Sequence, residues 1–274
     1  MSRFTGKLEA APPIPRAQSV GHASACPFAV ICAVAVFAAN AQTSYLLLDA
    51  THKTVIAIDW RAPDVAVPVG SLVKPFTAIT YGQRHRMRFP VYECTGEDCW
   101  LKTGHGRIGL ADAIAHSCNS YFRQLAADVS PADVWEVAER FGLRGPPADS
   151  DRDTLFGVGS AWRLSPLEVA RAYAELAARM AEPGVTEVIQ GMRLSASAGT
   201  AAAVGSALRD GEALAKTGTA PCSHSPRAAG DGYAVVVYPG DSPHYVLLVQ
   251  VHGEPGSQAA ETAARLLRVL TGAR

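Results

Sequence analysis

The chain has 274 residues, of which 48% are hydrophobic and 18% charged, so it is long enough to bury a core of one or two domains. Basic and acidic residues are balanced at 25 each. A balanced charge gives no electrostatic reason to expect nucleic acid as a partner.

The N-terminal part of the chain differs from the rest. No Asp, Glu, Lys or Arg occurs over residues 17–48, and residues 27–39 form an apolar run of 13 residues that follows three basic ones. Ala39-Asn-Ala41 fits a signal cleavage site, and a membrane span would need about 20 apolar residues. We expect residues 1–41 to be a secretory signal peptide or, alternatively, a retained membrane anchor. Residues 42–274 would then form a periplasmic or extracytoplasmic domain, secreted or anchored to the cytoplasmic membrane.

Four cysteines lie outside this leader: Cys94, Cys99, Cys118 and Cys222. In an oxidising compartment Cys94 and Cys99 could close a short loop as a disulfide, or they could be two reduced, packed thiols. A zinc site from these two with His105 is a third reading. It has no obvious fourth ligand, and exported proteins seldom use that pattern. The sequence assigns no metal and no cofactor.

Strands are predicted at both ends of the chain. Residues 45–49 and 54–59 form one hairpin pattern, and residues 232–239 and 244–251 form another. Residues 213–219 could supply a fifth strand.

The middle of the chain has helical patterns. Ser130-Pro131 begins one helix that stops at Gly142, and Ser165 opens a second with a capping box. Residues 110–127 are helical in pattern but interrupted around Ser117, and a last helix begins at about Ser257. This order predicts a mixed α/β (α+β) fold, in which the two ends of the chain close a sheet and a helical lobe is inserted. A cleft between sheet and lobe would be the natural site.

Residues 70–76, Gly-Ser-Leu-Val-Lys-Pro-Phe, place Ser71 and Lys74 on one face of a helix. A helix N-terminus favours an alkoxide or oxyanion, and a lysine whose pKa is lowered could take the serine proton. Pro75 is tolerated in a first turn, so it predicts a helix that begins at the serine. Taken alone, the motif is common by chance and favours a capped helix with a solvated lysine over a catalytic pair.

Two further motifs follow. Ser117-Cys-Asn119 interrupts a helical pattern with small polar residues. Lys216-Thr-Gly-Thr219 lies on a predicted strand, where its lysine and threonines could hold a carboxylate and its glycine could let a substrate backbone approach. The three motifs are spaced by 46 and 99 residues and have the order S-x-x-K, S-x-N, K-T-G.

With these motifs, the chain from about Tyr45 onward resembles the transpeptidase domain of penicillin-binding proteins, most closely the class B type. The stretches 115–122, 165–173 and 233–239 also look like stretches of that family. The resemblance implies a five-stranded antiparallel sheet flanked by helices with an inserted all-helical lobe, the fold shared with β-lactamases. It also implies a serine D-Ala-D-Ala transpeptidase or D,D-carboxypeptidase that acts on peptidoglycan stem peptides and that β-lactams inhibit. Cell-wall synthesis or division proteins would be its protein partners.

The resemblance also implies roles for the motif residues. Ser71 would be the nucleophile and Lys74 its base, Ser117 would relay a proton to the leaving amine, and Asn119 would orient Lys74 and the substrate amide. The substrate carboxylate would be bound by Lys216, Thr217, Gly218 and Thr219. The backbone N–H groups of Ser71 and Thr219 would form the oxyanion hole. His105 and Cys118 are interpreted as structural residues.

Two alternatives stay open. A β-lactamase needs a base that activates water, but residues 146–156 contain no Glu-x-x-Leu-Asn pattern, and Asn119 stands where class D enzymes have valine. A catalytically idle or sensory partner of the wall machinery would suit the short chain, which leaves no room for the additional domain of class B proteins.

Overall fold

The computed structural model describes residues 42–208, 212–222 and 230–273. The predicted leader, residues 1–41, lies outside the described residues. Within the described ranges, no helix is both long enough and apolar enough to cross a membrane.

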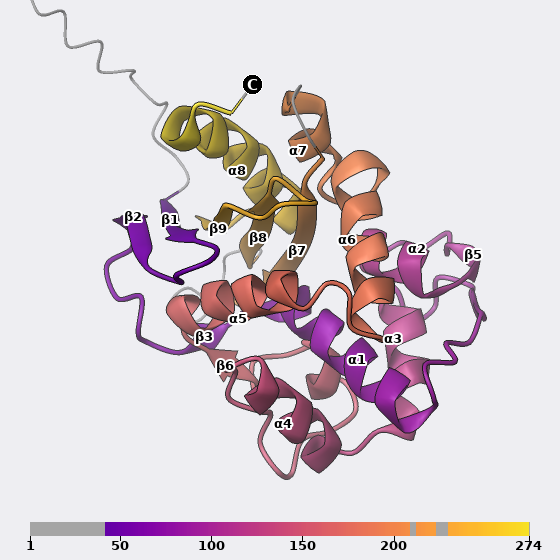
Figure 1. Cartoon of the computed structure of the whole chain (residues 1–274). Coiled ribbons are helices and arrows are strands. Elements are labelled where there is room, and N and C mark those ends of the chain that lie inside the picture. Colours follow the sequence, from indigo (N-terminus) through magenta and orange to yellow (C-terminus); the bar gives the residue numbers. More distant parts are fainter. Residues whose placement is uncertain (1–41, 209–211, 223–229, 274) are drawn as a thin grey trace, which may run out of the picture. The chain divides into compact units, whose positions relative to one another are not determined.

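A five-stranded antiparallel sheet is formed by both ends of the chain, as the sequence predicts (Figure 1). Its strands are β1 (Thr43–Asp49), β2 (Val55–Asp59), β7 (Leu214–Ala220), β8 (Asp231–Tyr238) and β9 (Tyr245–His252). The spatial order is β2-β1-β9-β8-β7. The N-terminal hairpin joins the C-terminal one through β1 and β9, where Thr43 pairs with Val251 and Asp49 with Tyr245.

The segment between β2 and β7 forms the inserted helical lobe. Its α-helices are α1 (Lys74–Arg84), α2 (Leu110–Ala115), α3 (Asn119–Leu125), α4 (Pro131–Arg140), α5 (Pro166–Ala178), α6 (Val185–Ala198) and α7 (Ala202–Ala207). Short 3-10 turns are η1 (Gly70–Val73), η2 (Ala126–Asp128) and η3 (Thr154–Phe156). Two small antiparallel pairs join β3 (Val67–Pro68) to β6 (Arg163–Leu164) and β4 (Tyr92–Cys94) to β5 (Gly106–Ile108). The chain ends with α8 (Gly256–Thr271).

The central sheet is buried on both faces except at its edge strand β2, which is mostly exposed. In β1, Leu46 and Leu48 join the core under the helical lobe, whereas Leu47 joins a second core with α8. Alternate side chains of a strand point to opposite faces, which explains this division. Small alanines of α8, among them Ala260 and Ala263, let that helix pack closely on β8 and β9 (Figure 1). The sheet is therefore a middle layer between α8 and the lobe.

The start of the first long helix differs from the prediction. Ser71 lies in the 3-10 turn η1, and the α-helix begins at Lys74. Pro75 has no N–H, so it cannot donate the α-helical bond to the carbonyl of Ser71. The N–H of Lys74 donates to that carbonyl instead, which gives the tighter turn. Helices α6 and α7 were not predicted at all.

Helix α5 begins with the capping box that the sequence predicts. The Ser165 hydroxyl accepts the N–H of Glu168 at 3.2 Å, and the Glu168 carboxylate accepts the N–H of Ser165 at 2.9 Å. Ser165→Ala should lower the free energy of unfolding by about 1 kcal/mol, because it removes a cap from a packed helix. Urea denaturation followed by circular dichroism measures this. Ser197→Ala, on the exposed face of α6, should stay within about 0.5 kcal/mol of the wild type. Equal losses in both variants would contradict the prediction.

Candidate active site

The predicted nucleophile lies where the lobe meets the last strand of the sheet. Ser71 is half-buried in η1. Its neighbour Gly70 has φ +59°, and a Cβ there would overlap the carbonyl oxygen of Thr219 in β7. On the other side, the buried Tyr173 hydroxyl donates to the carbonyl of Leu72 at 2.8 Å. Backbone packing thus holds η1 against β7, and a buried hydrogen bond fixes it to the helix α5.

Lys74 connects the first motif to the second. Its side chain is fully buried. The amine donates to the side-chain oxygen of Asn119 at 2.6 Å and to the carbonyl of Ser117 at 2.7 Å. The Ser117 hydroxyl lies 3.3 Å away. The rings of Phe122 and Phe156 lie 5.3 and 5.8 Å from the amine. These contacts fix the amine in a dry, partly aromatic pocket.

This burial determines the charge of the amine. Because desolvation disfavours the ammonium form, the pKa of Lys74 is lowered from 10.5 to about 7. Burial also lowers the pKa of Lys216 well below its ordinary value, and the charge of Lys74 lowers it further. A substantial fraction of Lys74 is therefore neutral near pH 7, and a neutral amine can accept a proton.

Ser117 is the point at which the three motifs converge. Its hydroxyl accepts a hydrogen bond from Lys216 at 2.8 Å and faces Lys74 at 3.3 Å. The residue has φ +52° and separates α2 from α3. Cys118 then caps α3, since its sulfur accepts the N–H of Tyr121 at 3.4 Å. The interruption predicted around Ser117 is thus a left-handed turn that points a hydroxyl at two amines.

The third motif lies on β7, as predicted. The Thr217 hydroxyl is 2.6 Å from that of Thr200, and the Thr219 hydroxyl accepts the N–H of Gly256 at 3.0 Å. A Cβ at Gly218 would lie 2.6 Å from the carbonyl oxygen of Val69. The protein's own packing therefore requires this glycine, whatever its role toward a substrate.

The structure brings most of the predicted site residues together. Lys74, Ser117, Asn119 and Lys216 are linked by hydrogen bonds. Ser71 precedes Lys74 by one turn and lies beside the strand that carries Thr217, Gly218 and Thr219. Sequence reasoning missed Thr200, Phe122 and Phe156. Phe122 lies within a family-like stretch and could have been noticed, whereas nothing local distinguishes Thr200.

A hollow of about 740 Å³ lies elsewhere in the described part of the chain. It is lined by residues of α6 and α7 together with Glu212 and Ala213, and it contains none of the three motifs. The candidate site is therefore defined by its hydrogen bonds and not by the size of a cavity.

Comparison with known proteins shows the family of the chain. A family model of the penicillin binding protein transpeptidase domain matches residues 35–268. The chain belongs to the penicillin-binding protein transpeptidase family. This is a family of acyltransferases of peptidoglycan synthesis. A search of curated proteins found no match.

Solved transpeptidase structures share the fold at low sequence identity. Pseudomonas aeruginosa PBP2, in complex with WCK 5153, has a TM-score of 0.68 at 18% identity, over 84% of this chain and 71% of that one. The transpeptidase domain of Burkholderia pseudomallei penicillin-binding protein 3 has a TM-score of 0.68 at 20% identity, over 86% and 90%. Helicobacter pylori PBP2, in complex with MreC, has a TM-score of 0.65 at 17% identity, over 85% and 61%. The penicillin-binding transpeptidase fold predicted from the sequence is confirmed.

The left-handed turn at Ser117 can be tested with two variants that both lack the hydroxyl. Ser117→Gly should be more stable than Ser117→Ala by roughly 0.5–1 kcal/mol, because glycine adopts positive φ without the steric cost that alanine has, although it loses more backbone entropy. Urea denaturation of the two proteins measures the difference. An alanine variant as stable as the glycine variant would show that the turn is not strained.

Proposed function

We propose that this protein is a penicillin-binding serine D,D-transpeptidase-like enzyme that acts on peptidoglycan stem peptides through an acyl-Ser71 intermediate. The observation that carries the proposal is the Lys74 amine, which is fully buried, has a pKa of about 7 and is hydrogen-bonded to Ser117 and Asn119.

The proposed reaction begins with proton transfer from the Ser71 hydroxyl to the neutral amine of Lys74. The serine oxygen then attacks the carbonyl carbon of the D-Ala-D-Ala amide. The backbone N–H groups of Ser71 and Thr219 would stabilise the oxyanion, which is often worth about 3–4 kcal/mol per donor. The close packing of η1 on β7 supports this pairing, because it places the two segments side by side.

Collapse of the tetrahedral intermediate breaks the amide bond and requires a proton on the leaving D-alanine nitrogen. In the proposal, the Ser117 hydroxyl supplies this proton and regains one from the amines that contact it, those of Lys74 and Lys216. An acceptor amine or water then attacks the acyl-enzyme and restores Ser71. An amine gives a crosslink, and water gives a carboxypeptidase product.

Lys216 and the threonines of β7 would bind the terminal carboxylate of the stem peptide. Lys216 and Thr217 are neighbours on β7, where the Lys216 amine donates to the Thr217 carbonyl at 2.7 Å and the Thr217 hydroxyl is paired with that of Thr200. β-Lactams present a carboxylate and a strained amide, so they would acylate Ser71 in the same way.

Stem peptides lie outside the cytoplasmic membrane, so we place the described domain there, as the composition of residues 17–48 favours. Helicobacter pylori PBP2 forms a complex with MreC. By analogy, we propose a partner among the cell-wall synthesis or division proteins.

Covalent labelling by a fluorescent penicillin tests the nucleophile. The wild type should form a stable adduct, whose mass is found on the peptide that contains Ser71. Ser71→Ala should remain unlabelled, because it lacks the hydroxyl that the proposed reaction acylates. Ser120→Ala is the matched control, since Ser120 follows Asn119 but its side chain contacts only Gln124 among the contacts described. It should label at the wild-type rate.

The outcomes of this experiment separate the remaining functions. Labelling together with crosslinked muropeptide from a donor stem peptide supports the enzyme. Labelling without any product from a stem peptide identifies a sensory or idle protein. Rapid nitrocefin turnover identifies a β-lactamase. Labelling of Ser71→Ala would overturn the assigned nucleophile.

The pH dependence of labelling tests the assigned base. Since only the neutral amine accepts a proton, the acylation rate should rise about tenfold per pH unit below about pH 7 and level off above it. The titratable groups that interact with this amine are the amine of Lys216, the thiols of Cys99 and Cys118, and the imidazole of His105. Lys74→Arg should label at a negligible rate at every pH, because a guanidinium does not lose its proton. A wild-type rate that is constant across neutral pH would contradict the role of Lys74.

A further inference from the structure

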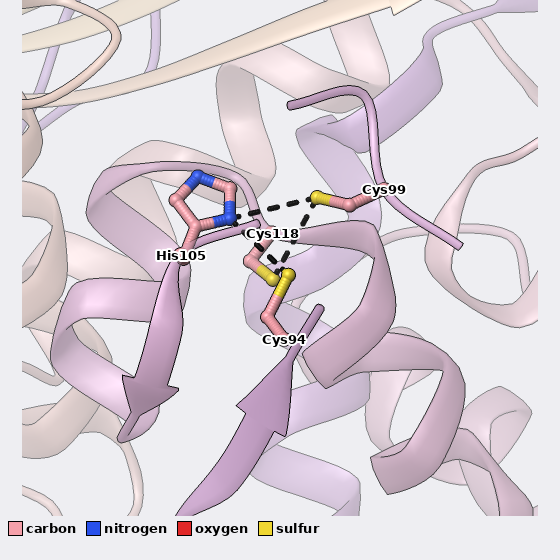
Figure 2. A group of neighbouring side chains, drawn as sticks. All are labelled: Cys94, Cys99, His105 and Cys118. Atoms are coloured by element: carbon pink, nitrogen blue, oxygen red, sulfur yellow. Dashed lines mark hydrogen bonds between the residues drawn. The ribbon is translucent and has the colours of Figure 1, made fainter. Parts of the chain in front are cut away.

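Three cysteines and one histidine that the proposed chemistry does not use converge beside the Ser117 turn (Figure 2). Cys94 is the last residue of β4, and His105 directly precedes β5. Cys99 lies in the loop between these two strands, and Cys118 is the N-cap of α3. A hairpin therefore supplies three of the side chains and a helix N-terminus supplies the fourth.

Three of the distances between donor atoms in this cluster match the edges of a tetrahedral metal site. The Nδ1 atom of His105 lies 3.5 Å from the sulfur of Cys94 and 3.6 Å from that of Cys99, and the sulfurs of Cys99 and Cys118 are 3.8 Å apart. All four donor atoms lie within 4.8 Å of one another. Zinc bonds of about 2.3 Å to sulfur and about 2.0–2.1 Å to nitrogen imply tetrahedral edges of about 3.8 Å between sulfurs and about 3.6 Å between sulfur and nitrogen.

Hydrogen bonding alone does not account for this convergence. The Nδ1 atom of a neutral histidine either donates one hydrogen or accepts one, yet it faces two thiols here. All three cysteines are free thiols that are at most 5% exposed.

The hairpin loop is held in shape by its own backbone. Gly96 and Gly104 have φ +94° and +76°. A Cβ at Gly104 would overlap the carbonyl oxygen of Cys94, and one at Gly96 would overlap that of Lys102. The His105 ring contacts the rings of Trp100 and His116, with centroids 5.6 and 5.7 Å away. These constraints hold the donors together independently of a ligand.

We propose that Cys94, Cys99, His105 and Cys118 form a structural site for a thiophilic divalent cation, with Zn²⁺ as the cation that fits best. Binding releases the protons of three thiols and uses the lone pair of the neutral histidine. Four protein ligands complete the tetrahedron, so no position remains for water or substrate, as in closed structural sites. The sequence assigned no metal, because it offered no obvious fourth ligand. That ligand is the middle residue of the second motif, Cys118.

The position of Cys118 links the metal to the acylation site. Its neighbours in the chain, Ser117 and Asn119, both accept hydrogen bonds from Lys74. A metal bound to Cys118 would fix the turn on which these two acceptors lie. This second step rests on the proposed function: loss of the metal should loosen the turn and slow acylation of Ser71.

Metal content and cobalt spectroscopy test the site. The full chain, expressed with zinc and purified under reducing conditions, should contain zinc that is lost only to a strong chelator. Replacement by Co²⁺ should give the visible bands of a tetrahedral thiolate complex and a sulfur-to-cobalt charge-transfer band. Cys94→Ser and Cys118→Ser should each weaken Co²⁺ binding more than about 100-fold. Loss of a residue that only hydrogen-bonds a ligand already lowers metal affinity about 10–100-fold.

Cys222→Ser is the matched control, because Cys222 lies in a different group of donors, with Asp231 and His252. It should retain the tetrahedral thiolate spectrum. A folded wild-type chain without zinc and without this spectrum would overturn the site, and so would an intact mass that shows a disulfide within the cluster. If Cys118→Ser fails to fold, Cys94→Ser decides the question, because Cys94 lies outside the second motif.

Penicillin labelling of the chelated and the zinc-loaded protein distinguishes a failure of the metal site from a failure of the proposed acyl transfer. Penicillin labelling should be at least about tenfold slower in the chelated protein and should recover on addition of Zn²⁺. A zinc-loaded chain that never labels contradicts the proposed function but leaves the site intact. A chelated chain that labels at the full rate contradicts the link between metal and turn.

Discussion

The arrangement depends on one hydroxyl that is held between two buried amines. Ser117 contacts Lys74 from the lobe and Lys216 from the sheet, and each amine disfavours the protonated form of the other. Two ammonium groups could not share so dry a space, so burial leaves protonation incomplete. The hydroxyl can occupy this position only because the chain between α2 and α3 takes a left-handed turn. The left-handed turn is thus the geometric condition for the contact between the three motifs.

The close approach of lobe and sheet is achieved with glycines. Gly70 and Gly218 bring η1 against β7, and a Cβ at Gly157 would overlap the carbonyl oxygen of Gly70. Since Lys74 and Ser117 belong to the lobe and Lys216 to the sheet, the site exists only when these two layers are in contact. A side chain at any of these glycines would separate the layers and thereby the amines, without touching a polar group of the site.

Most of the fold could be predicted from the sequence, because the apolar and β-branched runs of β1, β8 and β9 and the caps at Ser130 and Ser165 are local signals. The exact start of the first helix could not be predicted, since it depends on which backbone carbonyl is left without a hydrogen-bond donor at Pro75. The site residues were found by their order and spacing. The hydrogen bonds between them could not be predicted, because Thr200 and the rings of Phe122 and Phe156 reach the site only through tertiary packing. Cys118 shows the same limit: its neighbours in the chain suggested a passive middle position, whereas its neighbours in space are two cysteines and a histidine.

The pairing of β1 with β9 also determines the order in which the protein can be assembled. Thr43 needs Val251 as its partner, so the first strand waits for nearly the whole chain to be synthesised. Strand β7, which carries Lys216, acquires its neighbour β8 almost as late. Such long-range pairings make folding slow compared with local helix formation. A chain still emerging from the ribosome therefore cannot yet have the three motifs in contact, because β7 lacks its neighbour until the C-terminal strands have entered the sheet.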